Sequence, residues 1–335
     1  WSSDVCSSDL GGYDGADWNR TARPAGGSTD VDISVLVVNY NTADWVGRCV
    51  ESVLRQQGAT FELIVVDNHS ADESLPVLRA FGDRIRLIEH PENLGFGRAN
   101  NLAAREATGR YLFLLNPDAE LTDPHALARI ATAMDAHSDW GLAGTRVIQG
   151  REGRTASLHK TYPGEKSLGG RFQDLPGDIA WLIGASMVIP RSVFEEIHGF
   201  DEDFFLYGED ADICLRVRQR GYAIGCLEDV PVFHADGASE VAADPYDYTV
   251  RRRKARLLFY RKHYAPDEVV RVVRDDLQRV RRRLWWDRLR RAASLGLLDA
   301  DNLAQWSAIR DVCERFLEDE AEADEPRDAG ANEPR

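Results

Sequence analysis

The chain has 335 residues, of which 29% are charged and 43% hydrophobic, a balance typical of a globular protein of one or two domains. Its formal net charge of -15 argues against a general nucleic-acid-binding protein, because such proteins usually have a basic surface. The five cysteines are scattered without metal-ligand spacing, which favours reduced thiols in a cytosolic protein. No run approaches the roughly 18 apolar residues of a membrane span, and no signal peptide is apparent.

Both ends of the chain differ in composition from its middle. Residues 1–30 are rich in Ser, Gly and Asp without periodicity, so we expect a disordered or non-native leader. Residues 317–335 carry many acids among small residues, which predicts a disordered acidic tail. Between these ends we expect an α/β domain over residues 31–240 and a basic helical extension over residues 241–316.

Strands and helices alternate in the first part of the predicted α/β domain. Apolar runs at 31–38, 61–66, 85–89 and 111–115 predict strands, and the apolar spacing at 44–57 predicts a helix between the first two. This repeat is typical of a doubly wound, mostly parallel sheet with helices on both faces. No Gly-x-Gly-x-x-Gly motif follows the first strand, which argues against a dinucleotide fold of the dehydrogenase kind.

Polar residues stand where these predicted strands end. Asn39 and Asn41 follow the first strand, Asp67 follows the second, and the five apolar residues of the fourth stop at Asn116-Pro117-Asp118. Because the carboxyl ends of parallel strands meet at one edge of the sheet, these side chains are expected at one ligand-binding crevice. Asp118 is then placed to hold a cation against a phosphorylated substrate, although Asn-Pro-Asp is also an ordinary turn sequence.

Later segments add a glycine-rich loop and a long polar region. In the loop 92–101, Gly95 and Gly97 allow unusual backbone angles, and Arg98 suits a base, ribose or phosphate contact, although a plain turn is the alternative. Strands are predicted at 141–148 and 179–189, and the polar residues 149–178 between them are expected to form a long loop near the site.

The densest polar cluster runs from Gly199 to Asp212, where aromatic residues alternate with acids before a predicted helix. Glu209, Asp210 and Asp212 are explained equally well as first-turn acids that complement the helix dipole. That explanation leaves out the aromatic residues, which could desolvate a carboxylate and raise its pKa, as a general base requires. His234 follows a short apolar run, and beside a metal-holding Asp118 it becomes a candidate imidazole ligand.

Residues 246–290 have a helical pattern and many arginines, at 251–256 and again at 281–291. Basic residues interleaved with aromatic ones suit a helix that lies on an anionic membrane surface. The alternative is a solvated helix that packs its Leu and Trp face on the domain.

Six of these segments, in this order, resemble glycosyltransferase family 2, the inverting enzymes of GT-A fold. They are most similar to its bacterial, rhamnosyltransferase-like branch, and the resemblance covers roughly residues 32–264. The segments are 37–41, 65–70, 92–101, 114–118, 199–210 and His234. The resemblance implies a GT-A type fold for residues 31–240. It also implies a nucleoside-diphosphate-sugar donor, in which the nucleotide is uridine diphosphate or deoxythymidine diphosphate.

The resemblance also implies where the nucleotide sugar binds. Asp67 matches the acid that contacts the nucleotide base, with Asn39 and Asn41 beside it on the first loop. Arg98 and Asn101 lie in the loop that helps to frame the nucleotide.

The metal-binding and catalytic residues are implied in the same way. Asn116 and Asp118 occupy the position of the family's Asp-x-Asp motif, and Asn here replaces the first acid, which leaves Asp118 as the metal ligand. His234 matches the late metal-ligand histidine, and the ion would be Mg²⁺ or Mn²⁺. Asp210 matches the catalytic base, and Glu209 is expected to orient the acceptor.

These residues predict an inverting glycosyltransferase that acts on a hydroxyl of a cell-surface glycan or lipid-linked acceptor at the cytoplasmic membrane face, with rhamnose as one candidate sugar. Inversion needs one carboxylate base and no protein nucleophile, which fits the absence of a Ser-His or Cys-His signature. The alternatives are a sugar-nucleotide hydrolase or nucleotidyltransferase, which would release free sugar or exchange pyrophosphate without an acceptor, and a non-catalytic nucleotide- or glycan-binding protein.

Overall fold

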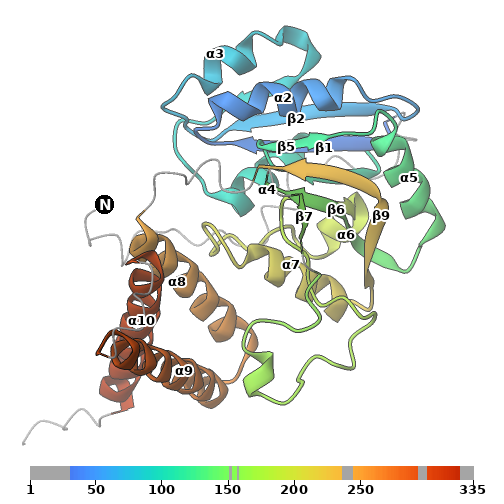
Figure 1. Ribbon diagram of the computed structural model, residues 1–335. Helices are drawn as coiled ribbons and strands as arrows, with labels where there is room; N and C mark the ends of the chain where they lie inside the picture. Colours follow the sequence, from blue (N-terminus) through green and yellow to red (C-terminus); the bar gives the residue numbers. More distant parts are fainter. Residues whose placement is uncertain (1–30, 151–152, 157, 236–243, 293–299, 325–335) are drawn as a thin grey trace, which may run out of the picture.

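The computed structural model describes residues 31–150, 153–156, 158–235, 244–292 and 300–324. These residues form an α/β domain around one sheet and, at its side, three long helices (Figure 1). The strand order in the sheet is β3-β2-β1-β4-β8-β6-β9-β5, and the short β7 pairs with β6. The predicted α/β class with a C-terminal helical extension is confirmed.

The first half of the sheet follows the sequence prediction closely. Its strands are all parallel: β1 (Ile33–Asn39), β2 (Phe61–Asp67), β3 (Arg86–Glu89) and β4 (Tyr111–Leu115). β1 and β4 are buried along their whole length, as expected for central strands covered on both faces. Asn39 and Asp67 are paired in register at the carboxyl ends of β1 and β2.

The second half of the sheet is mixed in direction. It contains β5 (Ala119–Leu121), β6 (Trp140–Gln149), β7 (Arg154–Thr155), β8 (Ser186–Pro190) and β9 (Ala223–His234). β8 runs antiparallel to both β4 and β6, β5 runs antiparallel to β9, and β6 and β9 are parallel. The chain enters β8 at the edge where β4 ends, because the N–H of Asn116 donates to the carbonyl of Ala185 at 3.0 Å.

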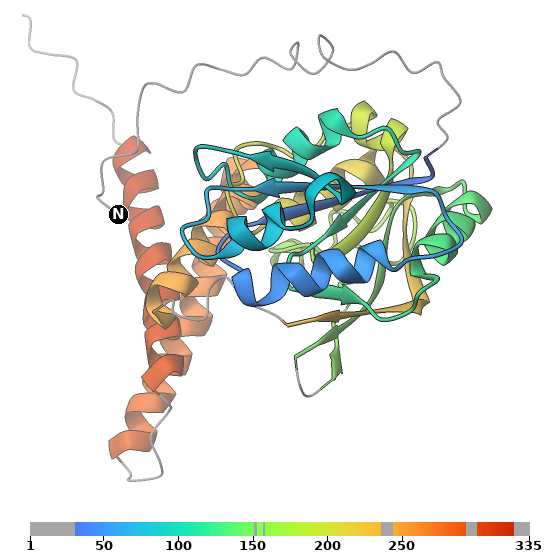
Figure 2. The same cartoon turned by 90° about the horizontal axis from the view of Figure 1, so that it is seen from above.

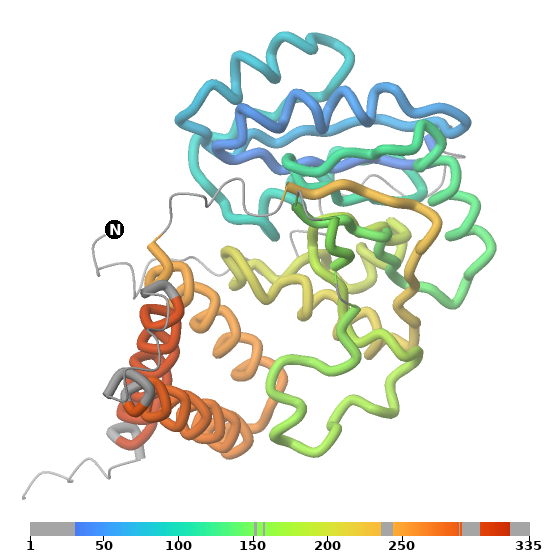
Figure 3. The backbone as a smooth tube through the Cα atoms, in the orientation of Figure 1, coloured from blue at the N-terminus to red at the C-terminus, as the bar shows by residue number. Residues whose placement is uncertain are grey.

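The apolar run 179–189 was expected to be one strand, and this prediction was wrong for its first part. Only Ser186–Pro190 joins the sheet. Trp181 instead forms an isolated bridge with His159, and its indole N–H donates to the carbonyl of Thr161 at 3.2 Å. Residues 149–178 were expected to form a long loop; β7 lies within this range, and residues 158–178 leave the sheet and pass the turn between α8 and α9 (Figure 3), where the Tyr264 hydroxyl donates to the Pro163 carbonyl at 2.6 Å.

Six helices cover the two faces of the sheet, and alternate strand residues point into two hydrophobic cores. Val35 and Phe113 pack with α2, α3 and α5, whereas Leu36 and Leu112 pack with α4, α6 and α7. This alternation explains why the central strands read as unbroken apolar runs. The helices are α2 (Ala43–Leu54), α3 (Ser74–Arg79), α4 (Phe96–Glu106), α5 (Ala126–Ala136), α6 (Arg191–Glu196) and α7 (Glu209–Gln219), with 3₁₀ turns at Gly82–Arg84 and Glu165–Ser167.

The C-terminal helices are α8 (Pro245–His263), α9 (Pro266–Ala292) and α10 (Ala300–Asp324), and Figure 2 shows them together at one side of the domain. A third hydrophobic core joins them to the residues around Tyr162 and Phe204. The tail expected to be disordered from residue 317 is instead helical as far as Asp324, because α10 packs Cys313 and Phe316 into this core. Within the described residues, no helix is both long enough and apolar enough to span a bilayer.

Candidate active site

Asn39 and Asp67 form a buried polar pair at the carboxyl ends of β1 and β2. The Asn39 Nδ2 group donates to Asp67 Oδ1 at 2.8 Å and to the Ser70 hydroxyl oxygen at 3.0 Å. The second oxygen of Asp67 accepts the backbone N–H of Ser70 at 3.1 Å. Both side chains are almost fully buried, so their geometry is fixed by the protein. The structure therefore brings together two residues that the sequence predicted at one crevice.

Asn41 connects the loops after β1 and β2 through hydrogen bonds. It has a positive φ of 51°, in the left-handed region that asparagine tolerates better than most residues. Its backbone N–H donates to the Ser70 hydroxyl oxygen at 3.0 Å, and its side-chain oxygen accepts the N–H of Ala71 at 2.7 Å. Asn41 thus contacts the same loop that closes around Asp67.

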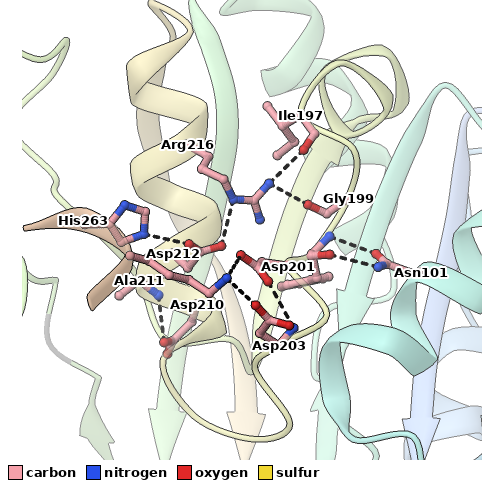
Figure 4. A network of polar contacts seen from close by, with 12 residues as sticks. Asn101, Ile197, Gly199, Asp201, Asp203, Asp210, Ala211, Asp212, Arg216 and His263 are labelled. Atoms are coloured by element: carbon pink, nitrogen blue, oxygen red, sulfur yellow. Dashed lines mark hydrogen bonds and ion pairs between the residues drawn. The ribbon is translucent and has the colours of Figure 1, made fainter. Parts of the chain in front are cut away.

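Arg98 and Asn101, both on α4, contact the loop that leads to the acidic cluster. Asn101 is buried; its Nδ2 donates to the Phe200 carbonyl at 3.0 Å and its Oδ1 accepts the Phe200 N–H at 2.8 Å. The Arg98 Nε donates to the carbonyl of Glu202 at 2.9 Å. Figure 4 shows Asn101 reaching across to the loop beside Gly199 and Asp201. The structure places both residues as links between α4 and the residues that precede Glu209.

Asn116, Asp118 and His234 meet where β5 pairs with the end of β9. Ala119 lies opposite His234 in the antiparallel register, which brings Asp118 next to the imidazole. The Asp118 Oδ1 lies 3.1 Å from His234 Nε2, and the Asn116 Nδ2 lies 3.3 Å from the same nitrogen. Asp118 and His234 are only 5% and 6% exposed. The sequence analysis named Asp118 and His234 as candidate ligands of one ion, but no spacing rule predicted that they lie in contact.

The Asp118 and His234 pair fits two neighbouring ligands of an octahedral ion. Ligands about 2.1 Å from such an ion are about 3.0 Å from each other, close to the 3.1 Å found here. Among the residues that the structure describes, no group of three or more His, Cys, Asp or Glu could enclose a metal. The protein would thus supply two ligands and leave the others to phosphate oxygens and water, as Mg²⁺ sites often do.

Glu209 and Asp210 begin α7 after a left-handed turn, in which Tyr207 and Gly208 have φ values of 71° and 85°. Glu209 is 6% exposed, and its Oε2 has no hydrogen-bond partner among the described residues. Burial, together with the charge of Asp210, raises the pKa of Glu209 to about 8. Burial also raises the pKa of Asp210 to about 6, against the opposing effects of the Ala211 N–H and the Arg252 charge.

Gly184 and Ala185 connect this carboxylate pair to the end of β4. A Cβ built on Gly184 would lie 3.7 Å from the Cβ of Asp210 and 3.8 Å from the ring of Phe96. The adjacent Ala185 accepts the N–H of Asn116 at 3.0 Å. The catalytic candidate and the metal candidate are therefore joined through two adjacent small residues. Sequence reasoning missed Gly184, although a glycine inside an apolar strand pattern is a known sign of close approach.

Asp212, the third acid of the cluster, is used for structure. Its two oxygens accept from His263 Nε2 and Arg216 Nε, each at 2.8 Å, and Arg216 Nη1 also donates to the carbonyls of Ile197 and Gly199 (Figure 4). Burial opposes the charge of Asp212, but the hydrogen bonds from His263 and Arg216 outweigh it and hold the pKa below its usual range. The sequence had no signal for His263, which lies in the last turn of a basic helix.

The end of α8 is fixed to the acidic cluster by a second set of contacts. The Lys262 ammonium lies 2.8 Å from a carboxylate oxygen of Asp201 and 2.6 Å from one of Asp203. With the His263 to Asp212 contact, these ion pairs attach α8 to the loop and to the helix that carry Glu209 and Asp210. The helical extension is thus part of the surroundings of the site.

Similar solved structures share this fold at low sequence identity. A mannosyltransferase from Pyrobaculum calidifontis, solved with GDP-Man and Mn²⁺, matches with a TM-score of 0.57 and 16% identity over 91% of this chain and 93% of that one. S. aureus TarS residues 1–349, solved with UDP-GlcNAc, match with a TM-score of 0.52 and 15% identity over 86% of this chain and 92% of that one. These similarities confirm the GT-A type fold.

The relatives found by sequence similarity differ in how much of their own length this chain covers. An O-antigen biosynthesis protein, RfbC, of Myxococcus xanthus is 28% identical over 67% of this chain, which spans only 18% of that protein. An uncharacterized protein, y4gI, of Sinorhizobium fredii is 27% identical over 66% of this chain and 26% of its own length. N-acetylglucosaminyl-diphospho-decaprenol L-rhamnosyltransferase of Mycobacterium tuberculosis is 23% identical over 69% of this chain and 84% of its own length.

The family is shown by a match over more than half of the sequence. The model of glycosyl transferase family 2 matches residues 34–212, a range that begins in β1 and ends in α7. That range contains Asp67, Asp118 and the Glu209–Asp210 pair. The chain belongs to glycosyltransferase family 2.

Proposed function

We propose that this chain is an inverting glycosyltransferase that moves a sugar from a nucleoside-diphosphate sugar to a hydroxyl of a cell-surface glycan or lipid-linked acceptor. The observation that carries this proposal is the pair of the buried Glu209 and the half-buried Asp210, joined through Gly184 and Ala185 to the edge that holds Asn116. The names of the relatives, which include O-antigen biosynthesis and L-rhamnosyl transfer, support this acceptor class and rhamnose as a candidate sugar.

The donor is proposed to bind at the carboxyl ends of the parallel strands. Asp67, held by Asn39 and Ser70, would accept hydrogen bonds from the nucleotide base, with Asn41 beside it. Arg98 and Asn101 would support the loop that frames the nucleotide. The two solved neighbours bound UDP-GlcNAc and GDP-Man, which supports a nucleoside-diphosphate donor, and we propose uridine or deoxythymidine diphosphate here.

Asp210 is proposed as the general base. Burial raises the pKa of both carboxyls, and the charge of Asp210 raises that of Glu209 further, so that Glu209 is the carboxyl that holds a proton more readily and Asp210 the one that ionises first. Two adjacent carboxyls that differ in this way can accept one proton and donate one hydrogen bond. Asp210 takes the proton of the acceptor hydroxyl as its oxygen attacks the anomeric carbon, the bond to the nucleoside diphosphate breaks, and the configuration inverts. Glu209 would orient the acceptor.

Asp118 and His234 are proposed to hold Mg²⁺ or Mn²⁺. When bound, the ion would neutralise the charge that develops on the departing diphosphate. The Asn116 Nδ2 group lies 3.3 Å from the same His234 nitrogen that would bind the ion, so this amide would have to turn away from the imidazole when the ion binds.

Thermal unfolding with a panel of nucleoside diphosphates and their sugars, each with and without Mn²⁺ or Mg²⁺, tests the donor site. A ligand that binds only the folded chain raises the melting temperature by mass action. We expect one nucleotide to give a metal-dependent rise, and no rise with any member would contradict the donor assignment. Product analysis then separates transfer from the alternatives, because a hydrolase releases free sugar and a nucleotidyltransferase exchanges pyrophosphate without an acceptor.

We also propose a peripheral contact with the anionic inner face of the cell membrane. Trp285 and Trp286 are 54% and 56% exposed near the end of α9, and Leu289 beside them is 41% exposed. Exposed tryptophans next to arginines suit the interface of an anionic bilayer. Flotation with anionic liposomes at low salt should recover the wild-type chain, and Trp285→Ser/Trp286→Ser should reduce recovery. Absence of wild-type binding at low salt would overturn this contact.

A further inference from the structure

One face of α8 carries two exposed arginines, Arg252 and Arg256, one helical turn apart. The Arg252 guanidinium carbon lies 5.3 Å from the ring centre of Tyr207 and 5.4 Å from that of Tyr248. Its Nη1 also donates to the Tyr248 hydroxyl oxygen at 2.9 Å, and the two rings meet edge to face at 5.9 Å. Stacking between two aromatic rings restricts a side chain that is otherwise flexible. Arg252 is thus held in one place although it is exposed.

That place is next to the Glu209–Asp210 pair. Tyr207 precedes Glu209 by two residues, and a Cβ built on Gly208 would lie 3.3 Å from the carbonyl oxygen of Ala255 on α8. The backbone of α8 therefore touches the turn from which the catalytic helix begins. The charge of Arg252 reaches Asp210, since it is one of the groups that lower the pKa of that carboxyl.

Arg256 lies one turn further along the same face. Burial, and then the charge of Arg256, lower the pKa of His159. The His159 ring stacks on Trp181 at 3.7 Å, three residues before Gly184, which approaches Asp210. Arg252 and Arg256 thus lie on one face of α8, near the turn before Glu209 and near the segment around Trp181.

The other cations of α8 differ from these two because carboxylates neutralise them. Arg253 pairs with Asp276 at 2.7 Å, and Lys262 pairs with Asp201 at 2.8 Å. Among the described residues, neither Arg252 nor Arg256 has a carboxylate within ion-pair distance. In a chain with a net charge of -15, two such guanidinium groups one helical turn apart beside the catalytic acids indicate a site for an anion.

We propose that Arg252 and Arg256 bind a phosphoryl group of the acceptor, so that the accepting hydroxyl belongs to a sugar or lipid that carries a phosphate or diphosphate. This inference rests on the proposed transferase function and names the acceptor class for it. Guanidinium groups bind phosphate oxygens through paired N–H donors. The diphosphate of the donor is assigned to the edge with Asp118 and His234, whereas the arginines lie beside the base that receives the acceptor proton.

Calorimetric titration with farnesyl diphosphate, a short soluble lipid diphosphate, tests the proposal. EDTA is present so that a metal at Asp118 cannot hold the probe. The wild type should bind, and Arg252→Gln/Arg256→Gln should bind about tenfold or more weakly, because it loses two charge-assisted contacts. The matched control is Arg271→Gln/Arg274→Gln, which removes the same charge from exposed positions of α9 and should bind like the wild type. Equal binding by all three proteins, or no binding by the wild type, would overturn the proposal.

A second titration, with the nucleoside diphosphate that stabilises the wild type in Mn²⁺, distinguishes the donor from the acceptor. Nucleotide affinity should stay within about twofold of wild type in Arg252→Gln/Arg256→Gln. If it falls together with the affinity for farnesyl diphosphate, the arginines serve the donor and the acceptor assignment is wrong. If no nucleotide binds the wild type while farnesyl diphosphate binding still depends on both arginines, the donor site fails and the phosphoryl site stands. Arg256→Gln alone gives the same test should the double variant not fold.

Discussion

The two acidic regions of this family 2 chain place their carboxylates in different surroundings. At the end of β2, Asp67 accepts hydrogen bonds from Asn39 and from the Ser70 backbone, so its charge is balanced by fixed donors. At the start of α7, Glu209 has a buried oxygen without a partner among the described residues, and Asp210 accepts the N–H groups of Ala211 and Gly184, which only partly offset its burial. Fixed donors favour the ionised form of a carboxylate, whereas burial that donors do not fully offset raises its pKa.

The largest effect should come from removing the base. Asp210→Asn keeps the shape of the side chain but cannot accept a proton, so sugar transfer should fall by about 10²- to 10⁴-fold. Nucleotide binding should persist, because Asp210 is not one of the residues proposed to bind the donor. Asp174→Asn, at an exposed position, serves as the control. Turnover close to that of the wild type would remove Asp210 as the base.

Substitutions of Asp118 and His234, the proposed metal ligands, should instead reduce binding. Asp118→Asn or His234→Ala removes one of two proposed ligands, and Mn²⁺ affinity should fall by roughly 10- to 100-fold or more, measured from the electron paramagnetic resonance signal of free Mn²⁺. Glu120→Gln, on β5 two residues after Asp118, changes a carboxyl that pairs with Arg48 and should leave the affinity unchanged. Unchanged Mn²⁺ binding in both Asp118 and His234 variants would place the metal elsewhere.

The raised pKa values also predict a cost in stability. A carboxyl whose pKa is about 8 when folded and near its ordinary value when unfolded binds more protons in the folded state between those values. Its contribution is therefore present at low pH and is lost as the pH rises towards 8. Glu209→Gln should unfold like the wild type at pH 4 and be more stable by about 2–4 kcal/mol at pH 9, measured by urea unfolding. If the difference in unfolding free energy between the wild type and this variant is the same at pH 4 and pH 9, the raised pKa of Glu209 is contradicted.

The ionisation of Asp210 should also determine how kcat falls at low pH. Because Asp210 must be ionised to act as a base, kcat should decline as the pH falls through about 6. Substituting Arg252 with Gln removes one charge that favours the ionised form, so the decline should then begin at a higher pH. If the pH dependence of kcat is unchanged in this variant, the charge of Arg252 does not affect the ionisation of Asp210.

The smallest effect should come from the attachment of α8. His263→Ala leaves one oxygen of the buried Asp212 without its imidazole donor, and the free energy of unfolding should fall by about 1–2 kcal/mol. His125→Ala, at an exposed position, should change it by less than about 0.5 kcal/mol. Equal stability of the two variants would mean that the contact between His263 and Asp212 does not stabilise the attachment of α8, which would then depend on the Lys262 ion pairs and the apolar contacts.

Sequence reasoning worked best where one local pattern decides the structure. The apolar runs of β1, β2 and β4 and the polar residues at their ends follow from burial on both faces and from the strand-end rule, which needs no distant partner. The Glu209–Asp210 pair also stood out, because its aromatic neighbours were unusual for a simple helix start.

The failures share a dependence on distant contacts. Residues 179–185 read as a strand, but the bridge from His159 to Trp181 takes them away from the sheet. Residues 317–324 looked too acidic to fold, yet Phe316 and its neighbours bury one face of α10 against the other helices. The contacts between Asp118 and His234, and between Asp212 and His263, join residues whose separation along the chain follows no spacing rule.

The distance along the chain between Asp118 and His234 also has a consequence for the order of assembly during synthesis. The strands β1 to β4 and the Asn39–Asp67 pair are complete once residue 115 has emerged, whereas β5 has to wait for β9 before it can pair. At about 5–20 residues per second, a ribosome needs roughly 6–24 s to make the intervening segment. A nascent chain can therefore form the Asn39–Asp67 pair well before the Asp118–His234 contact, and β5 stays unpaired in the interval.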